Sequence, residues 1–179
     1  MAIAVSLWFD AELEARIRAL WQELAMAGIH SSLFDGRYRP HITLGAWEFG
    51  PRAELEAALR VWLADKVRFG VEFRSVGLFP DGDGVVFLQP HVTTALLALQ
   101  RETFTLVSRL GNPASPYFDP GRWVPHCTMA WGVPREKILQ AAALVLGRLS
   151  IKGTVDAVGV IDTPAEVELK RFDLRAQEP

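Results

Sequence analysis

The feature that most constrains the fold of this chain is an internal repeat, in which the same motifs recur in the same order. Pro40-His41-Ile42-Thr43 returns as Pro125-His126-Cys127-Thr128, with an offset of 85 positions between the two histidines. Pro51-Arg52 returns as Pro134-Arg135 after 83 residues, and a later Val-Gly pair recurs after 82 residues. A nearly constant offset indicates two copies of one supersecondary unit.

Each copy is predicted to contain strand, helix, loop, motif strand, helix and strand, because the spacing of apolar residues changes in that order. The first copy is expected to have strands at 3–9, 41–49 and 67–79, helices at 11–27 and 51–64, and a loop at 31–39. The second is expected to have strands at 85–89, 124–133 and 151–161, helices at 93–110 and from Pro134, and a loop at 111–121. A last strand is expected at 166–174.

This order of elements predicts an α+β fold in a single domain of residues 1–179. The repeats at about 3–78 and 85–160 predict a bilobal, pseudo-two-fold arrangement. Each lobe is expected to be a small, mostly antiparallel sheet with helices on its outer face. The two motif strands are expected to face each other across a central cleft.

Composition limits the compartment and the partners of the chain. Its 179 residues are 50% hydrophobic, enough for one sizeable core, and 22% charged, which argues against disorder. A net charge of −2 argues against stable binding of long nucleic acid, whereas a small anionic substrate could be held by a few local donors. Cys127 is the single cysteine, so no intramolecular disulfide can form. We expect a cytoplasmic monomer with no signal peptide and no membrane-spanning segment.

The two His-x-Thr motifs contain the side chains that are the candidates for catalysis. Residues two apart on a strand share a face, so His41 and Thr43 are expected to point into the cleft, and His126 and Thr128 to repeat the arrangement. One neutral imidazole can take a proton from water and one protonated imidazole can give a proton to a leaving ribose oxygen. The threonine hydroxyls can bind non-bridging phosphate oxygens. The pattern therefore predicts phosphodiester hydrolysis; which histidine is acid and which is base stays open.

A third segment, His91-Val92-Thr93, also fits the pattern and tests its specificity. The repeat aligns His91 with the first strand-to-helix junction and not with His41. We interpret His91 as structural, with Thr93 or Thr94 capping the helix that follows.

Basic and aromatic residues beside the motifs are further candidates for substrate binding. Arg37 and Arg39 precede the first motif and Arg122 precedes the second, although solvated loops explain these arginines equally well. Five aromatic side chains are candidates for stacking on a base: Trp47, Tyr117, Phe118, Trp123 and Trp131. Trp47 is expected on the same strand face as His41, and Tyr117 and Phe118 lie in the loop that leads to the second motif.

Other enzyme classes find little support in the sequence. It contains no H-x-x-x-H or C-x-x-C cluster that would predict a metal site, and no cofactor is expected. The glycines at 82 and 84 lack the lysine of a phosphate-binding loop. The alternation turns Cys127 inward, which disfavours a role as nucleophile.

The two motifs, Pro40-His41-Ile42-Thr43-Leu44 and Pro125-His126-Cys127-Thr128-Met129, resemble the paired H-x-T/S-x motifs of the 2H phosphoesterase superfamily. Almost the whole chain shares the resemblance, and three further features are similar to its cyclic phosphodiesterase branch: Val5-Ser6-Leu7-Trp8, Pro116-Tyr117, and Val76-Gly77 followed by Val85-Val86-Phe87-Leu88-Gln89. Members include 2′-5′ RNA ligase-like proteins and enzymes that open 2′,3′- or 1″,2″-cyclic phosphates.

The resemblance implies a bilobal fold, catalysis by His41 and His126 without a metal, and phosphate binding by Thr43 and Thr128. Where many ligase-like members carry a basic residue after the second motif, this chain has Ala130-Trp131-Gly132. Substrate choice therefore stays open between a cyclic nucleotide, a 2′-5′ phosphodiester and an RNA end. Ligase-like activity, and a module that binds nucleotides or RNA ends without turnover, are the alternatives.

Overall fold

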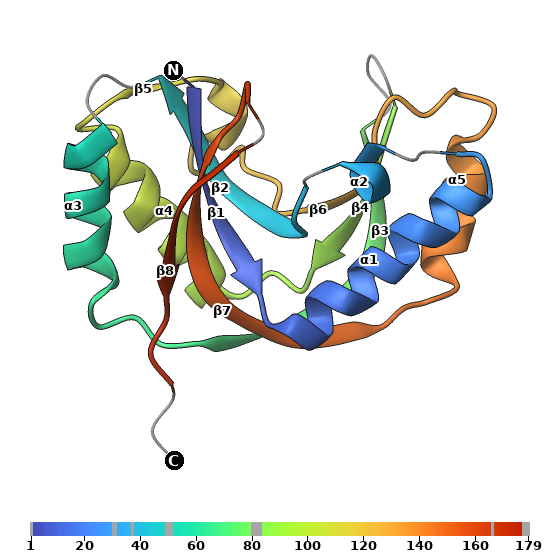
Figure 1. The fold of residues 1–179 in the computed structure, drawn as a ribbon, viewed down its shortest axis with the longest axis horizontal. Coiled ribbons are helices and arrows are strands. Elements are labelled where there is room, and N and C mark those ends of the chain that lie inside the picture. Colours follow the sequence, from blue (N-terminus) through green and yellow to red (C-terminus); the bar gives the residue numbers. More distant parts are fainter. Residues whose placement is uncertain are drawn as a thin grey trace.

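The computed structural model describes residues 2–29, 32–36, 38–48, 52–79, 84–165 and 167–176. Its helices and strands follow one another along the chain, and Figure 1 shows their arrangement. The elements are β1 (Ala2–Phe9), α1 (Ala11–Met26), α2 (Ser32–Asp35), β2 (His41–Glu48), α3 (Arg52–Leu63), β3 (Phe69–Phe79), β4 (Val85–Pro90), α4 (Thr94–Val107), β5 (Asn112–Pro113), the 3₁₀ turn η1 (Pro116–Phe118), β6 (Cys127–Ala130), α5 (Ile138–Leu146), β7 (Ile151–Asp162) and β8 (Val167–Asp173).

The strands form one continuous sheet in the order β5-β2-β1-β7-β3-β4-β6, with β8 also paired to β7. Every named strand pair is antiparallel, which confirms the predicted α+β class. The long strand β7 joins the two halves, since residues 151–155 pair with β3 and residues 155–162 pair with β1. We call β5, β2, β1, β7 and β8 the β2 arm, and β3, β4 and β6 the β6 arm.

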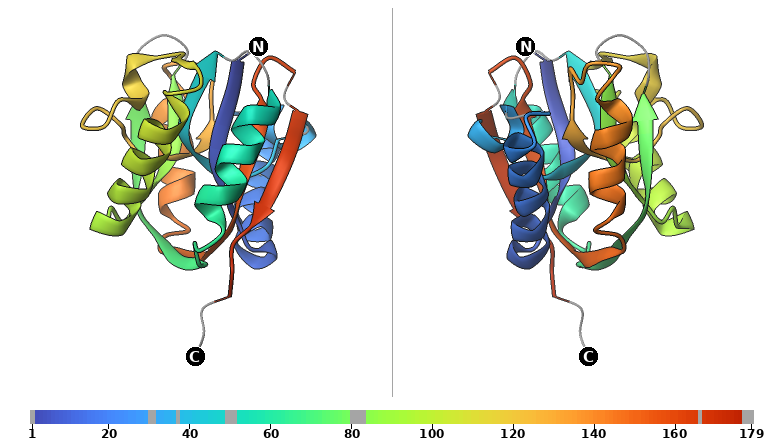
Figure 2. Two further views of the ribbon diagram at one scale, coloured as in Figure 1. Left: turned by 90° about the vertical axis from the view of Figure 1, so that its left-hand side faces the viewer. Right: turned by 90° about the vertical axis from the view of Figure 1, so that its right-hand side faces the viewer.

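Each arm takes elements from both sequence copies. Strand β7, from the second copy, pairs with β1 in the β2 arm, and β3, from the first copy, pairs with β4 in the β6 arm. Helix α4 packs on β2, whereas α1 packs on β6. Figure 2 shows α3 and α4 on one flank and α1 and α5 on the other. The repeats at 3–78 and 85–160 therefore do not coincide with the two arms.

Local signals explain where the helices begin and end. The Asp10 side chain accepts a hydrogen bond from the amide of Leu13 at 2.8 Å and so caps α1, and Gly28, at φ 65°, follows its end. Thr93 caps α4 by accepting from the amide of Leu96 at 3.1 Å, which confirms the cap predicted in the third His-x-Thr segment.

Four predicted segments differ from the structure. The helix expected from Pro134 begins only at Ile138. The loop expected at 31–39 contains α2, and the loop expected at 111–121 contains β5 and η1. The second motif strand spans only Cys127–Ala130 rather than 124–133, and Gly132, at φ 62°, turns the chain just after its end. No helix within the described ranges is long and apolar enough to cross a bilayer.

Candidate active site

The first motif lies at the start of β2 with the alternation that the sequence predicts. Ile42 and Leu44 are fully buried in the core, whereas His41 and Thr43 are half-buried on the opposite face. The second motif repeats this pattern: Cys127 and Met129 are buried and Thr128 is half-buried. Strands β2 and β6 come from opposite arms and contact each other, and Figure 1 shows them meeting between the arms.

The two imidazole rings are held in the same way. The Nδ1 atom of His41 lies 2.6 Å from the carbonyl oxygen of Arg39, and that of His126 lies 2.7 Å from the carbonyl oxygen of Val124. A carbonyl can only accept, so Nδ1 carries the proton in both rings. Each neutral ring is therefore left with Nε2 as an acceptor, the atom that a general base needs.

Burial sets the protonation of both rings. It lowers the pKa of His41 below 6.5, partly offset by the bond to the Arg39 carbonyl, and the nearby His126 lowers it further by charge repulsion. Burial also lowers the pKa of His126. That ring is packed against Phe79 and Phe87, with each centroid 5.2 Å from the imidazole centroid. Double protonation of the pair is disfavoured, because each charge raises the cost of the other.

Two pockets flank the histidines. The His41 pocket has a volume of about 280 Å³, and its wall includes His41 and Thr43. The His126 pocket has a volume of about 410 Å³, and its wall includes His126 and Arg122. Phe118 lines both pockets, so the two spaces adjoin at this side chain. Each histidine therefore lines one of two neighbouring pockets.

The threonines are fixed through their backbone carbonyls. The indole N–H of Trp123 donates to the carbonyl of Thr43 at 2.9 Å, and that of Trp21 donates to the carbonyl of Thr128 at 3.1 Å. The buried Ser6 hydroxyl lies 3.5 Å from the Thr43 hydroxyl. Thr43 lines the His41 pocket, whereas neither pocket lining includes Thr128.

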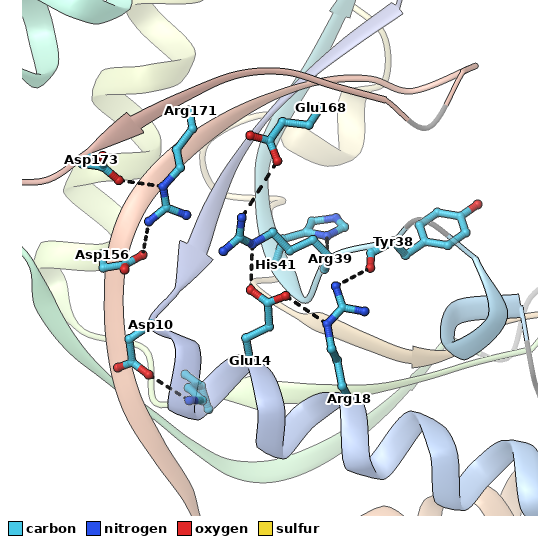
Figure 3. A network of polar contacts seen from close by, with 11 residues as sticks. Asp10, Glu14, Arg18, Tyr38, Arg39, His41, Asp156, Glu168, Arg171 and Asp173 are labelled. Atoms are coloured by element: carbon cyan, nitrogen blue, oxygen red, sulfur yellow. Dashed lines mark hydrogen bonds and ion pairs between the residues drawn. The ribbon is translucent and has the colours of Figure 1, made fainter.

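The three candidate arginines differ in position. The Arg39 side chain lines the His41 pocket and stacks 4.9 Å over the Trp8 ring. Its Nε lies 2.8 Å from Glu14, and Figure 3 shows these two side chains pointing toward each other. Arg122 is exposed and lines the His126 pocket. Arg37 lies outside the described residues. The Arg39 charge is thus already balanced by Glu14 at the cleft.

The aromatic candidates separate into pocket and core residues. Tyr117, a residue that is 78% exposed, and Phe118 both line the His126 pocket. Trp123 lines it too while its N–H is bound to Thr43. Trp131 is half-buried and packs edge-on against Tyr38.

The prediction for Trp47 was wrong. The side chain is fully buried and donates its N–H to the Ser108 hydroxyl at 3.0 Å. A β-bulge leaves Leu44 without a partner on β1, since Val5 pairs with Gly45 and Ser6 with Thr43. The extra residue shifts the alternation of side chains on β2 by one position, so Trp47 points into the core instead of sharing the face of His41.

Cys127 is a core residue, as its position on the strand predicts. Burial raises the pKa of its thiol to about 12, so the thiolate form is suppressed. The structure adds pocket residues that the sequence did not single out. Trp8 follows Ser6 on the same face of β1, a signal that alternation could have supplied. Thr163 and Glu168 also line the His41 pocket, and no local pattern marks them.

The part of the chain that the structure describes contains no set of side chains suited to bind a metal ion. These residues include no group of three or more His, Cys, Asp or Glu side chains that could hold an ion.

The fold is similar to that of several solved structures. The crystal structure of TT0787 of Thermus thermophilus superposes with a TM-score of 0.66 at 17% identity, covering 99% of this chain and 100% of that chain. Apo LigT of E. coli gives 0.64 at 17% identity, covering 97% of each chain. LigT complexed with 3′-AMP gives 0.60 at 14% identity, covering 96% of this chain and 97% of that one. These similarities show the fold.

Among curated protein sequences, none matches this chain. The family model of the 2′-5′ RNA ligase superfamily, however, matches residues 9–166 and so includes both His-x-Thr motifs. This chain therefore belongs to the 2′-5′ RNA ligase superfamily, one of the 2H phosphoesterases.

Proposed function

We propose that this protein is a metal-independent phosphodiesterase that acts on a 2′,3′- or 1″,2″-cyclic nucleotide phosphate or a 2′-5′ phosphodiester. The single observation that carries the proposal is the matched pair of imidazoles, each with Nδ1 held by the carbonyl two residues before it. Two equivalent rings at one cleft supply one general base and one general acid.

The reaction follows from this geometry. The neutral ring takes a proton from water through Nε2 while the water oxygen forms a bond to phosphorus. The bond from phosphorus to the leaving ribose oxygen breaks, and the protonated ring gives its proton to that oxygen. Because repulsion between His41 and His126 disfavours double protonation, one ring is neutral when the other is charged.

The threonine hydroxyls are proposed to bind the non-bridging oxygens, where negative charge must be stabilised. Thr43 suits this role because it lines the His41 pocket, and the Ser6 hydroxyl lies 3.5 Å from its hydroxyl. We propose the same role for Thr128, which lies on β6 two residues after His126, the spacing that places two side chains on the same side of an extended chain.

Small nucleotides or RNA ends are the proposed partners. LigT, which shares the fold, has been crystallised with 3′-AMP, ATP and NADP+. Tyr117, Phe118 and Arg122 in the His126 pocket and Arg39 in the His41 pocket are the proposed substrate contacts. A cytoplasmic, monomeric protein stays a prediction.

Ligase-like activity is the second candidate, favoured by the match to the 2′-5′ RNA ligase superfamily. Ligation joins a cyclic phosphate end to a 5′-hydroxyl by the same proton transfers with the alcohol in place of water. The two activities are distinguished by their products.

The test is a panel of nucleoside 2′,3′-cyclic phosphates, an ADP-ribose 1″,2″-cyclic phosphate and 2′-5′ dinucleotides, with chromatographic separation of the products. His41→Ala and His126→Ala should each lower turnover by about 10²–10⁴-fold while nucleotide binding persists. His91→Ala is the matched control, because His91 is exposed and follows β4 outside the cleft. Turnover that survives in both variants, or that a chelator abolishes, overturns the mechanism; binding without any turnover indicates the binding module instead.

A further inference from the structure

The two pockets differ at one end, where the β7–β8 hairpin meets the His41 pocket. Ile161, Thr163 and Glu168 of this hairpin line that pocket, and Ile161 and Glu168 are cross-strand neighbours. Strand β8 lies beyond the second sequence copy, so the His126 pocket has no counterpart to it. The described residues that line the His126 pocket include no carboxylate.

The Glu168 carboxylate is available to a ligand. Its side chain is 49% exposed, and its nearest ion-pair contact, with Nη1 of Arg39, is long at 3.9 Å. Arg39 makes its short contact with Glu14, at 2.8 Å. Figure 3 shows Glu168 above the Arg39 guanidinium, with His41 beside it. The carboxylate thus lies next to the proposed catalytic centre with most of its hydrogen-bonding capacity unused.

Thr163 presents a second acceptor at the same end of the pocket. Its hydroxyl donates its one proton to the carbonyl of Ala2 at 3.1 Å, so its oxygen can only accept from a ligand. Two acceptors, one of them charged, repel a phosphate. They favour a group that presents several N–H donors.

We propose that Glu168 is a specificity-determining residue that selects a nucleobase with amino and imino N–H donors, guanine above all. This inference rests on the proposed function, which places the phosphodiester at His41. Guanine offers N1–H and N2–H side by side, a match for the two oxygens of one carboxylate. Uracil offers one N–H between two carbonyls, which a carboxylate repels. Tyr38 and Phe118, in the same pocket, supply apolar ring surfaces for the base.

The experiment compares kcat/KM of the full chain for the 2′,3′-cyclic phosphates of guanosine, adenosine, cytidine and uridine. The wild type should prefer guanosine to uridine by roughly 10- to 100-fold, the range of one good bidentate base contact. Glu168→Gln keeps the size of the side chain and removes its charge, and should bring the ratio to within about threefold. The matched control is Glu54→Gln, an exposed carboxylate on α3, which should keep the wild-type ratio.

Equal turnover of all four nucleotides, or an unchanged guanosine-to-uridine ratio in Glu168→Gln, overturns the inference. If the wild type turns over none of the four, the base preference is instead measured by calorimetric titration with 3′-GMP and 3′-UMP. The proposed function fails only if the 1″,2″-cyclic phosphate and the 2′-5′ dinucleotides are not turned over either. Tighter binding of 3′-GMP that Glu168→Gln abolishes supports the inference. Equal binding of the two nucleotides, or binding of neither, overturns it.

Discussion

The indole N–H of Trp123 donates a 2.9 Å hydrogen bond to the backbone carbonyl of Thr43, and so joins the segment before the second motif to the first motif. Trp21 makes the matching bond to Thr128 from α1. Beyond these carbonyls, β2 pairs with β5 only at residues 47 and 48, and β6 is the last strand of the sheet. Each indole therefore satisfies a motif carbonyl that no strand reaches.

Trp123→Phe should lower the free energy of unfolding by about 1–3 kcal/mol, because it leaves the carbonyl of Thr43 without its donor in a buried place. It should also lower kcat, since Thr43 is then less firmly placed. Urea denaturation and steady-state kinetics measure the two effects. Trp62→Phe is the control, because its N–H donates to the exposed Glu102. An equal loss of stability in both variants would show that the carbonyl contact is unimportant.

The pH profile of kcat/KM should be bell-shaped with its maximum below pH 6.5. Burial lowers the pKa of both His41 and His126 below that value, and the active form carries one proton shared between them. The maximum lies midway between the two apparent pKa values. Initial rates from pH 4.5 to 9 at low substrate concentration check this. A maximum above pH 7 contradicts it.

The same shifts should make the fold less stable in acid. In the unfolded chain the histidines titrate near pH 6.5, whereas the folded chain resists protonation until lower pH. The unfolded state therefore binds more protons below pH 6.5, and stability falls as the pH falls. The double variant His41→Gln/His126→Gln should lose less stability between pH 7 and 5 than the wild type, by urea titration at each pH. His91→Gln should follow the wild type.

Cys127→Ala should retain turnover within a few-fold, and iodoacetamide should modify the native protein slowly at pH 7.5. The reason is that the thiol is buried and its pKa is raised to about 12, so little thiolate exists at this pH. Mass spectrometry with and without urea measures the alkylation. Loss of turnover by orders of magnitude in a folded variant would show a catalytic thiol.

Gln100→Leu should destabilise the fold by about 1–3 kcal/mol and raise KM. The side-chain amide of Gln100 is buried and donates to the carbonyls of Phe118, at 2.7 Å, and Leu44, at 3.2 Å. It thereby holds the residue that both pockets share. Denaturation and kinetics measure the effects against Gln140→Leu, an exposed position on α5. A KM equal to that of the wild type would mean that Phe118 does not need this anchor.

The parts of the site that depend on local geometry could be predicted from the sequence. The faces of His41 and Thr43 follow from the two-residue period of a strand, and Thr93 is a cap because of its place before an apolar helix. Trp47 could not be placed in this way. The bulge that turns it inward is set by pairing between β1 and β2, which the local sequence does not report.

The residues that line the pockets could not be predicted from the sequence either, because their positions depend on long-range pairing. Glu168 reaches the His41 pocket because β8 pairs with β7, and Trp21 reaches Thr128 because α1 packs behind β6. Both contacts join residues that lie more than one hundred positions apart in the sequence, so no local pattern predicts them. The repeat predicts that the halves are alike, and it leaves open which strand of one copy pairs with the other.

Strand β3 of the first copy pairs in the β6 arm, and strand β7 of the second copy pairs in the β2 arm. The two copies thus exchange strands as the subunits of a domain-swapped dimer do, although both belong to one chain. Neither half closes its own sheet: β1 lacks its second neighbour without β7, and β4 lacks its own without β3. A peptide bond cut between Phe79 and Gly84 would thus leave two fragments that complement each other. The cleft, with one histidine from each half, exists only where both are present.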